Sequence, residues 1–86
     1  MGRKERIEVA LQALEPTELI VLDESEQHRG HGGWQEGGET HYRIRIRAAA
    51  LTGLSRVESH RRINALLAGE FGTGLHALAI EVRSAA

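Results

Sequence analysis

The segment HYRIRIR, residues 41–47, alternates polar and apolar side chains with the period of two that is typical of a β-strand. Tyr42, Ile44 and Ile46 would share one face of this strand. The opposite face would carry one histidine and three arginines: His41, Arg43, Arg45 and Arg47. We therefore expect a strand over residues 39–47 with one face buried in a core and the other face in water.

An amphipathic helix and another strand precede residues 39–47. Residues 18–23 form a compact, partly β-branched apolar run, which predicts a strand. Before this run, apolar side chains recur at the spacing of one helical face: Ile7, Ala10, Leu11 and Leu14. The pattern indicates a helix over about residues 3–14 that stops before Pro16. Between the two strands, residues 24–38 hold five glycines and two histidines, so we expect a long loop of a kind that often carries function.

A second helix and a third strand follow residues 39–47. Ser55 and Glu58 have the spacing of a capping box, which predicts a helix that runs through about Ala68. Three glycines are expected to end this helix: Gly69, Gly72 and Gly74. Residues 75–83 are mostly apolar and are typical of a strand.

The order of these elements predicts the topology of the sheet. A strand, helix and strand in succession normally place their two strands parallel, with a right-handed connection, so strands 39–47 and 75–83 should be parallel neighbours. Strand 18–23 should lie antiparallel beside strand 39–47. The sequence thus predicts an α/β protein of the α+β type, with the order α-β-β-α-β. Both helices should cover one face of a three-stranded mixed sheet.

The composition limits the classes of protein to which the chain can belong. Its 86 residues are enough for one domain, residues 1–86, with a formal net charge of −1 and no cysteine. Disulfides, a thiolate nucleophile and any all-thiolate zinc or iron–sulfur site in this chain are therefore excluded. No apolar run approaches the ~20 residues of a membrane span, and no signal-peptide core follows the start. We expect a cytoplasmic protein with no membrane partner.

Three histidines are candidate functional residues. His76 is the only polar residue at the start of an otherwise apolar strand, where an imidazole adds little to packing, so we interpret it as a ligand or contact residue. His28 and His31 lie in the glycine-rich loop, and a chain without cysteine would have to hold a metal mainly through histidine. The alternative is structural for each: a histidine bonded to a backbone carbonyl at position 76, and exposed loop residues at 28 and 31.

Two groups of arginines raise the possibility of nucleic-acid binding. The strand group comprises Arg43, Arg45 and Arg47, and the helix group comprises Arg56, Arg61 and Arg62. A solvated charged surface is the alternative, since the net charge is balanced and few aromatic side chains are available for base stacking. No catalytic motif is present, and Asp23 is the only aspartate, so we expect no enzymatic activity.

Four pieces of the chain together resemble the BolA family, in the right order and over nearly the whole length. They are Asp23-Glu24-Ser25, Gly38-Glu39-Thr40-His41-Tyr42-Arg43, the run from Gly53 to Asn64, and Leu75-His76-Ala77-Leu78-Ala79-Ile80. The resemblance implies a class II KH-like fold. It also implies a non-enzymatic partner of a monothiol glutaredoxin, which shares with it a glutathione-bearing [2Fe–2S] cluster in cluster trafficking or in iron and redox sensing.

The resemblance also implies which side chains hold the cluster. In the family, a histidine at the start of the last strand and a His or Cys in the loop between the first two strands supply ligands. These positions match His76 and the pair His28 and His31, of which His28 lies nearer the end of the first strand. No cluster is expected in the isolated chain. DNA binding as a transcriptional regulator is the alternative function that the family suggests, and a weak homodimer is left open.

Two further histidines have weaker claims. His41 shares a strand face with three arginines, so we expect it on a solvated surface and rank it below His28 and His31 as a cluster ligand. His60 is expected to face inward and to bond to a neighbouring element. It lies on a helical stripe with Val57, Ile63, Asn64, Leu67 and Phe71.

Overall fold

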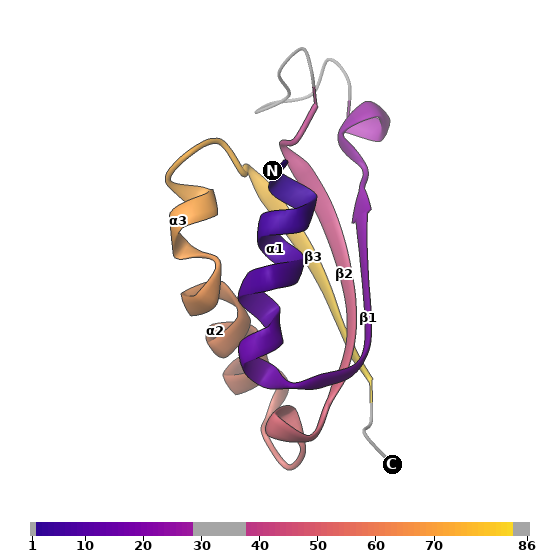
Figure 1. The fold of residues 1–86 in the computed structure, drawn as a ribbon, viewed down its shortest axis with the longest axis vertical. Helices are drawn as coiled ribbons and strands as arrows, with labels where there is room; N and C mark the ends of the chain where they lie inside the picture. The colour runs from indigo at the N-terminus through magenta and orange to yellow at the C-terminus, as the bar shows by residue number, and fades with distance from the viewer. Residues whose placement is uncertain (1, 29–37, 84–86) are drawn as a thin grey trace.

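The computed structural model describes residues 2–28 and 38–83, with the side chains of Gln27 and His28 outside the description. Its helices and strands follow the predicted order (Figure 1). They are α1 (Arg3–Leu11), β1 (Pro16–Asp23), β2 (His41–Ala48), α2 (Arg56–Leu66), α3 (Ala68–Phe71) and β3 (Ala77–Arg83). Short 3-10 turns lie at η1 (Gln12–Leu14), η2 (Ser25–His28) and η3 (Ala49–Leu51).

The three strands form one mixed sheet in the order β1-β2-β3. β1 pairs antiparallel with β2, and Val21 lies opposite Ile44. β2 pairs parallel with β3, and Ile44 lies opposite Ile80. The predicted α+β class, the topology and the direction of each strand are thereby confirmed, and a KH-like arrangement is compatible with them.

Both long helices cover the same face of the sheet (Figure 1). Ile44 and Ile46 of β2 are fully buried there, as are Ile7 and Leu11 of α1 and Ile63 of α2. They belong to a single apolar cluster, which confirms the predicted core face of residues 39–47. Burial of these side chains supplies the main driving force for packing the helices on the sheet.

Helix α2 begins as predicted, because the Ser55 Oγ accepts a hydrogen bond of 3.1 Å from the backbone N–H of Glu58. Its end differs from the prediction. The helical chain changes direction at Leu67 and continues as the short helix α3, so Gly69 lies inside a helix and does not end one. The chain turns only afterwards, at Gly74, whose φ of 126° is a backbone conformation that favours glycine.

The predicted inward stripe of α2 is confirmed at Ile63 and Leu67 but is wrong at Val57 and Phe71. The side chains that point into the core are Ser59, Ile63 and Leu67, which recur every four residues. Val57 is 58% exposed and Phe71 is 39% exposed. Phe71 lies beyond the break at Leu67, where a stripe extrapolated from α2 no longer applies. Val57 lies before the break, in the first turn of α2, and its side chain faces solvent. No helix in the described ranges is long and apolar enough to span a bilayer.

Candidate functional site

Three strand ends meet at one end of the sheet. β1 ends at Asp23 opposite Tyr42, and β2 and β3 begin side by side at His41 and Ala77. β1 therefore ends, and β2 begins, at the same end of the sheet as the start of β3 (Figure 1). His76 immediately precedes β3 in the chain. This arrangement brings the base of the predicted loop to the residue that the sequence singled out.

Hydrogen bonds close the base of this loop. The Ser25 Oγ accepts hydrogen bonds from the backbone N–H groups of Thr40 at 3.0 Å and His41 at 3.2 Å. The Glu24 N–H donates to the His41 carbonyl at 2.8 Å. Because Ser25 and Thr40 are both almost fully buried, these bonds fix the two sides of the loop to each other with little competition from water. The sequence motifs on both sides of the loop pointed to this region, but not to the role of the serine hydroxyl.

His76 is fixed through its backbone and exposed through its side chain. Its N–H donates to the Thr40 carbonyl at 2.8 Å, and the N–H of Ala77 donates to the same oxygen at 3.1 Å. Its imidazole is exposed and forms no hydrogen bond with any residue in the described ranges. The prediction of a histidine held at the sheet end and open to a partner agrees with this geometry.

The ring of His41 lies close to the ring of His76, which the sequence did not predict. The centroids of the two rings are 5.3 Å apart, with an angle of 53° between the ring planes. His41 is 5% exposed, and its Nδ1 lies 2.9 Å from the Thr40 Oγ1. The expectation of a solvated His41 was therefore wrong, because the closed base of the loop covers the start of β2. As a cluster ligand, His41 remains a lower-ranked prediction.

A shallow hollow of about 210 Å³ lies beside this histidine pair. Residues of β2 and β3 line it together with Glu24: His41, Tyr42, Arg43, Ala77, Leu78 and Ala79. Burial and the nearby carboxylates of Asp23 and Glu39 raise the pKa of Tyr42 to about 12, so its phenol stays protonated at neutral pH. Burial opposes the ionisation of Asp23, but hydrogen bonds from Ser25, from the backbone of Glu39 and from Tyr42 together outweigh it and lower the pKa of Asp23.

The structure describes the loop histidines, His28 and His31, only in part. The backbone of His28 ends the turn η2, and its side chain lies outside the description. His31 and Trp34 also lie outside the described residues. Within residues 2–28 and 38–83, no three histidine or carboxylate side chains gather into a group that could hold a metal ion.

The strand arginines do not form the exposed basic row that the sequence suggested. Arg43 donates to Glu24 at 3.0 Å and to Glu81 at 3.1 Å, and these two hydrogen bonds raise its pKa. Arg45 also forms an ion pair with Glu81, with 3.4 Å between nitrogen and oxygen. Arg43, Arg45 and Arg47 are only partly exposed. Pairing β2 with β3 places an acidic residue among the arginines and neutralises much of their charge.

A larger groove lies at the opposite end of α2 from α3. It has a volume of about 570 Å³ and lies between the start of α2 and the end of β3. It is lined by residues 51–54, Arg56, Ser59, His60 and residues 80–83. His60 is half-buried there, but its imidazole forms no hydrogen bond with another described residue, so the predicted tie to a neighbouring element is absent from that part of the chain. Arg56, Arg61 and Arg62 are exposed on α2.

Comparison with known proteins identifies the family. The family model described as BolA-like protein matches residues 11–86. A protein of Sinorhizobium, known from the cobS 5' region, is 49% identical over 83 residues, which cover 94% of this chain and 89% of that protein. The solved BolA domain of SufE1 from Arabidopsis thaliana is 44% identical with a TM-score of 0.85, and the match covers 98% of this chain and 94% of that domain.

A second solved relative, BolA1 from Arabidopsis thaliana, is 39% identical with a TM-score of 0.85, over 98% of this chain and 93% of the other. The full-length plant proteins are longer, since the match covers 51% of BOLA1 and 21% of SufE-like protein 1 from Arabidopsis thaliana. The first is described as chloroplastic and the second as chloroplastic/mitochondrial. The expected cytoplasmic location therefore stays a prediction. The fold, the family model and these relatives agree, and the chain belongs to the BolA family.

Proposed function

We propose that this protein is a non-enzymatic partner of a monothiol glutaredoxin, with which it shares a glutathione-bearing [2Fe–2S] cluster in cluster trafficking or in iron and redox sensing. Membership of the BolA family supports this proposal. The SufE-like name of one relative points in the same direction, toward iron–sulfur metabolism.

The exposure of His76 is the observation that carries the proposal. Its imidazole reaches solvent without a hydrogen-bond partner among the described residues, so a ring nitrogen is available to a metal. Its backbone is held by Thr40, which limits the movement of the side chain's point of attachment. An exposed donor on a fixed backbone fits a terminal ligand of a cluster that a second protein also holds.

The second ligand from this chain would come from the loop, through His28 or His31. Both lie between Ser25 and Thr40 in the sequence, and these two residues form the closed base of the loop, which adjoins His76. Histidine in place of thiolate raises the reduction potential of a [2Fe–2S] centre and gives a ligand that protonates near neutral pH. A cluster that is passed on or sensed benefits from such labile ligands.

The test is the visible spectrum of the complex. The protein would be mixed anaerobically with its own organism's monothiol glutaredoxin, glutathione, iron and sulfide, and absorption and circular dichroism would be recorded. We expect a heteromeric [2Fe–2S] spectrum that His76→Ala abolishes or strongly perturbs. His60→Ala is the matched control, because it removes a half-buried histidine from the groove between α2 and β3. A wild-type spectrum from the His76→Ala complex would refute the ligand assignment.

The loop histidines should behave differently from His76. We expect His28→Ala and His31→Ala each to have a mild effect, because the two residues are three positions apart and one can replace the other. Only the double variant should resemble His76→Ala. A single loop variant that destroys the spectrum would instead identify one ligand and remove the redundancy.

Nucleic-acid binding has less support. The ion pairs of Arg43 and Arg45 with acidic side chains lower the positive charge of the sheet face, and Arg61 is paired with Glu58 on α2. A DNA-binding protein would shift duplex DNA in a strongly salt-dependent manner without any cluster. Such a shift, together with no spectrum in the glutaredoxin mixture, would favour the alternative function.

A further inference from the structure

We propose that Arg3 is a positioning residue for His76. Its side chain would hold the turn that leads into His76 while its backbone holds the base of the histidine-bearing loop. The consequence for the cluster rests on the proposed function, but the geometric effect on His76 does not.

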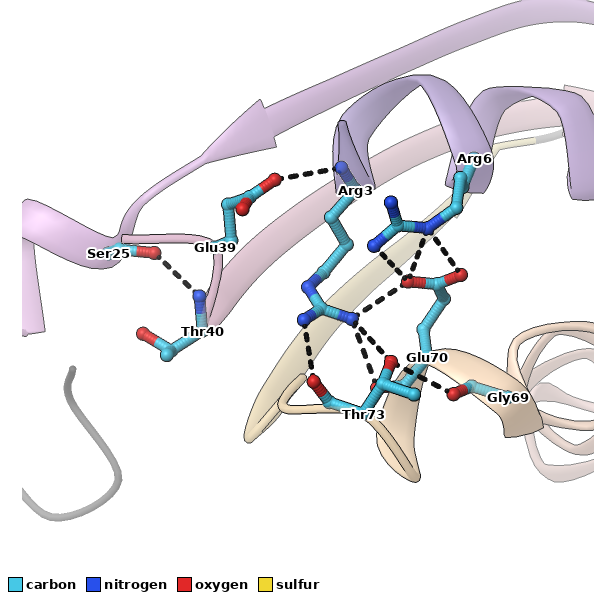
Figure 2. A network of polar contacts seen from close by, with 8 residues as sticks. All are labelled: Arg3, Arg6, Ser25, Glu39, Thr40, Gly69, Glu70 and Thr73. Atoms are coloured by element: carbon cyan, nitrogen blue, oxygen red, sulfur yellow. Dashed lines mark hydrogen bonds and ion pairs between the residues drawn. The ribbon is translucent and has the colours of Figure 1, made fainter. Parts of the chain in front are cut away.

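Arg3 is buried. Its guanidinium contacts acceptors of Glu70 and Thr73, which precede His76 in the sequence (Figure 2). Its Nη1 donates to the Glu70 carboxylate at 2.8 Å, to the Glu70 carbonyl at 3.1 Å and to the Thr73 Oγ1 at 3.2 Å. Its Nη2 donates to the Thr73 carbonyl at 3.0 Å. One side chain from the start of α1 thus fixes the backbone carbonyls of Glu70 and Thr73, and Thr73 lies three residues before His76.

The turn fits closely around this guanidinium. Gly74 has a φ of 126°, and a Cβ added there would lie 3.0 Å from the Arg3 Nη2. The N–H of Leu75 donates to the same Glu70 carbonyl that Arg3 contacts. The path of the chain from Glu70 to Leu75 is therefore shaped around Arg3, and His76 is the next residue.

Arg3 also contacts the other side of the candidate site. Its backbone N–H donates to the Glu39 Oε1 at 2.8 Å (Figure 2). Glu39 adopts a φ of 63° and precedes Thr40, whose carbonyl accepts the N–H of His76. The two segments held by Arg3 thus meet in the hydrogen bond that fixes His76.

Arg6 provides a contrast within the same network. Its guanidinium forms hydrogen bonds of 3.1 to 3.2 Å with the Glu70 carboxylate, but the bonds described for it do not reach the Thr73 carbonyl or Glu39 (Figure 2). Its side chain is 38% exposed, against 8% for Arg3. Changing Arg6 to lysine therefore keeps the positive charge and removes guanidinium hydrogen bonds to the Glu70 carboxylate, while the contacts of Arg3 with the turn stay in place.

The planar guanidinium is what allows one residue to serve several acceptors. A lysine ammonium keeps the charge but is a compact group without the forked donor geometry of arginine, so it cannot reproduce the contacts with both Glu70 and Thr73. Arg3→Lys is therefore the informative change, with Arg6→Lys as its matched control. Thr73→Val is a milder variant with little change in shape. It removes the hydroxyl that accepts from Arg3 and donates to the carbonyls of Gly69 and Glu70, and it covers the case in which Arg3→Lys does not fold.

The first arm uses the isolated protein and NMR. In the wild type we expect nuclear Overhauser contacts between the rings of His41 and His76 and slow exchange of the His76 amide. Arg3→Lys should weaken the ring contacts and speed exchange of that amide about tenfold, with a smaller change in Thr73→Val and none in Arg6→Lys. Wild-type contacts and exchange in a folded Arg3→Lys, or, where that variant does not fold, in Thr73→Val, would overturn the proposal.

The second arm uses the glutaredoxin complex and separates the two hypotheses. If the wild type forms a cluster, Arg3→Lys should alter its visible circular dichroism and speed cluster loss, whereas Arg6→Lys should not. An unchanged spectrum and lifetime in Arg3→Lys would overturn the effect on the cluster. If the wild type forms no cluster, the proposed function fails, and the NMR arm still decides whether Arg3 positions His76.

Discussion

Two networks of arginine and glutamate lie on opposite sides of the sheet and serve different purposes. On the helical side, Glu70 accepts hydrogen bonds from Arg3 and Arg6, and the side chains of Arg3 and Glu70 are 8% and 16% exposed. On the open side, Glu81 pairs with Arg43 and Arg45, and all three side chains are at least 36% exposed. The residue types are the same, but their access to water differs.

From this difference we conclude that the burial of an ion pair, and not the number of ion pairs, decides how much the pair contributes to stability. Water screens the open-side pairs and competes for their hydrogen bonds, so they neutralise charge but add little to stability. Around Arg3 such competition is weak, and losing one partner leaves a buried group uncompensated. The buried network can therefore determine the path of the chain near His76.

The largest predicted effect follows from breaking the buried network. Arg3→Ala should lower the free energy of unfolding by about 3 kcal/mol, because it leaves the Thr73 carbonyl without its donor and leaves the Glu70 carboxylate with only the bonds from the more exposed Arg6. Urea unfolding followed by circular dichroism would measure the loss. A loss no greater than that of a surface substitution would mean that the buried and open networks do not differ in energy.

The next largest effect is expected in the pH dependence of stability, which should differ between the buried network and the open network. Hydrogen bonds from Arg6, reinforced by the charges of Arg6 and Arg3, lower the pKa of Glu70 below its usual 4.5. A lowered pKa in the folded state means that the stabilisation is complete above about pH 4.5 and is lost as the pH falls further. Glu70→Gln should therefore flatten the acid side of the stability profile.

Glu81 is the control for that experiment. Hydrogen bonds from Arg43 also lower its pKa, but the pair is exposed. Glu81→Gln should change the acid side of the stability profile less than Glu70→Gln does. Added salt should remove the remaining difference between Glu81→Gln and the wild type, because salt screens exposed ion pairs. Equal profiles for the two variants would contradict the comparison.

A smaller effect is expected when Arg6 is changed. Arg6→Ala should destabilise the fold much less than Arg3→Ala, since Glu70 keeps its bonds to Arg3 and the Arg6 side chain already reaches water. Thermal unfolding of the two single variants and of the double variant would test this order. Because both residues bond to Glu70, their effects should not be additive.

The smallest effect on stability is expected on the open face. Changing Arg43, Arg45 and Arg47 together to serine should leave the fold and cluster formation nearly intact, because exposed pairs contribute little. Any association with DNA or RNA should weaken with the loss of positive charge. Nucleic-acid affinity that does not change across a salt series would direct attention to Arg56, Arg61 and Arg62 instead.

Periodicity predicted the elements of the fold because it reflects local geometry. The alternation of Tyr42, Ile44 and Ile46 identified the central strand and its buried face, and Ser55 with Glu58 marked the start of α2. The same reasoning failed where the chain departs from regular geometry. Phe71, beyond the break at Leu67, is exposed although the extrapolated stripe placed it inward.

The candidate site was predicted only in part. The position of His76 in an apolar strand was sufficient to single it out, since a polar residue there conflicts with its surroundings. The pairing of His41 with His76 required the closing of the loop by Ser25 and Thr40, which are 15 residues apart in the sequence. Local patterns carry no information about such contacts.

Sequence patterns alone were enough to predict the order of the helices and strands, the sheet topology and the core face, and to select His76 as a candidate ligand. These features depend on side-chain periodicity and on the handedness of chain connections, which act over a few residues or a single crossover. Three features became evident only in the folded structure: the hydrogen bond from Arg3 to Thr73, the burial of His41, and the ion pairs of Arg43 and Arg45 with Glu81. The physical reason is that burial and ion pairing depend on which distant segments come together, and most polar residues are compatible with several such partners until the chain has packed.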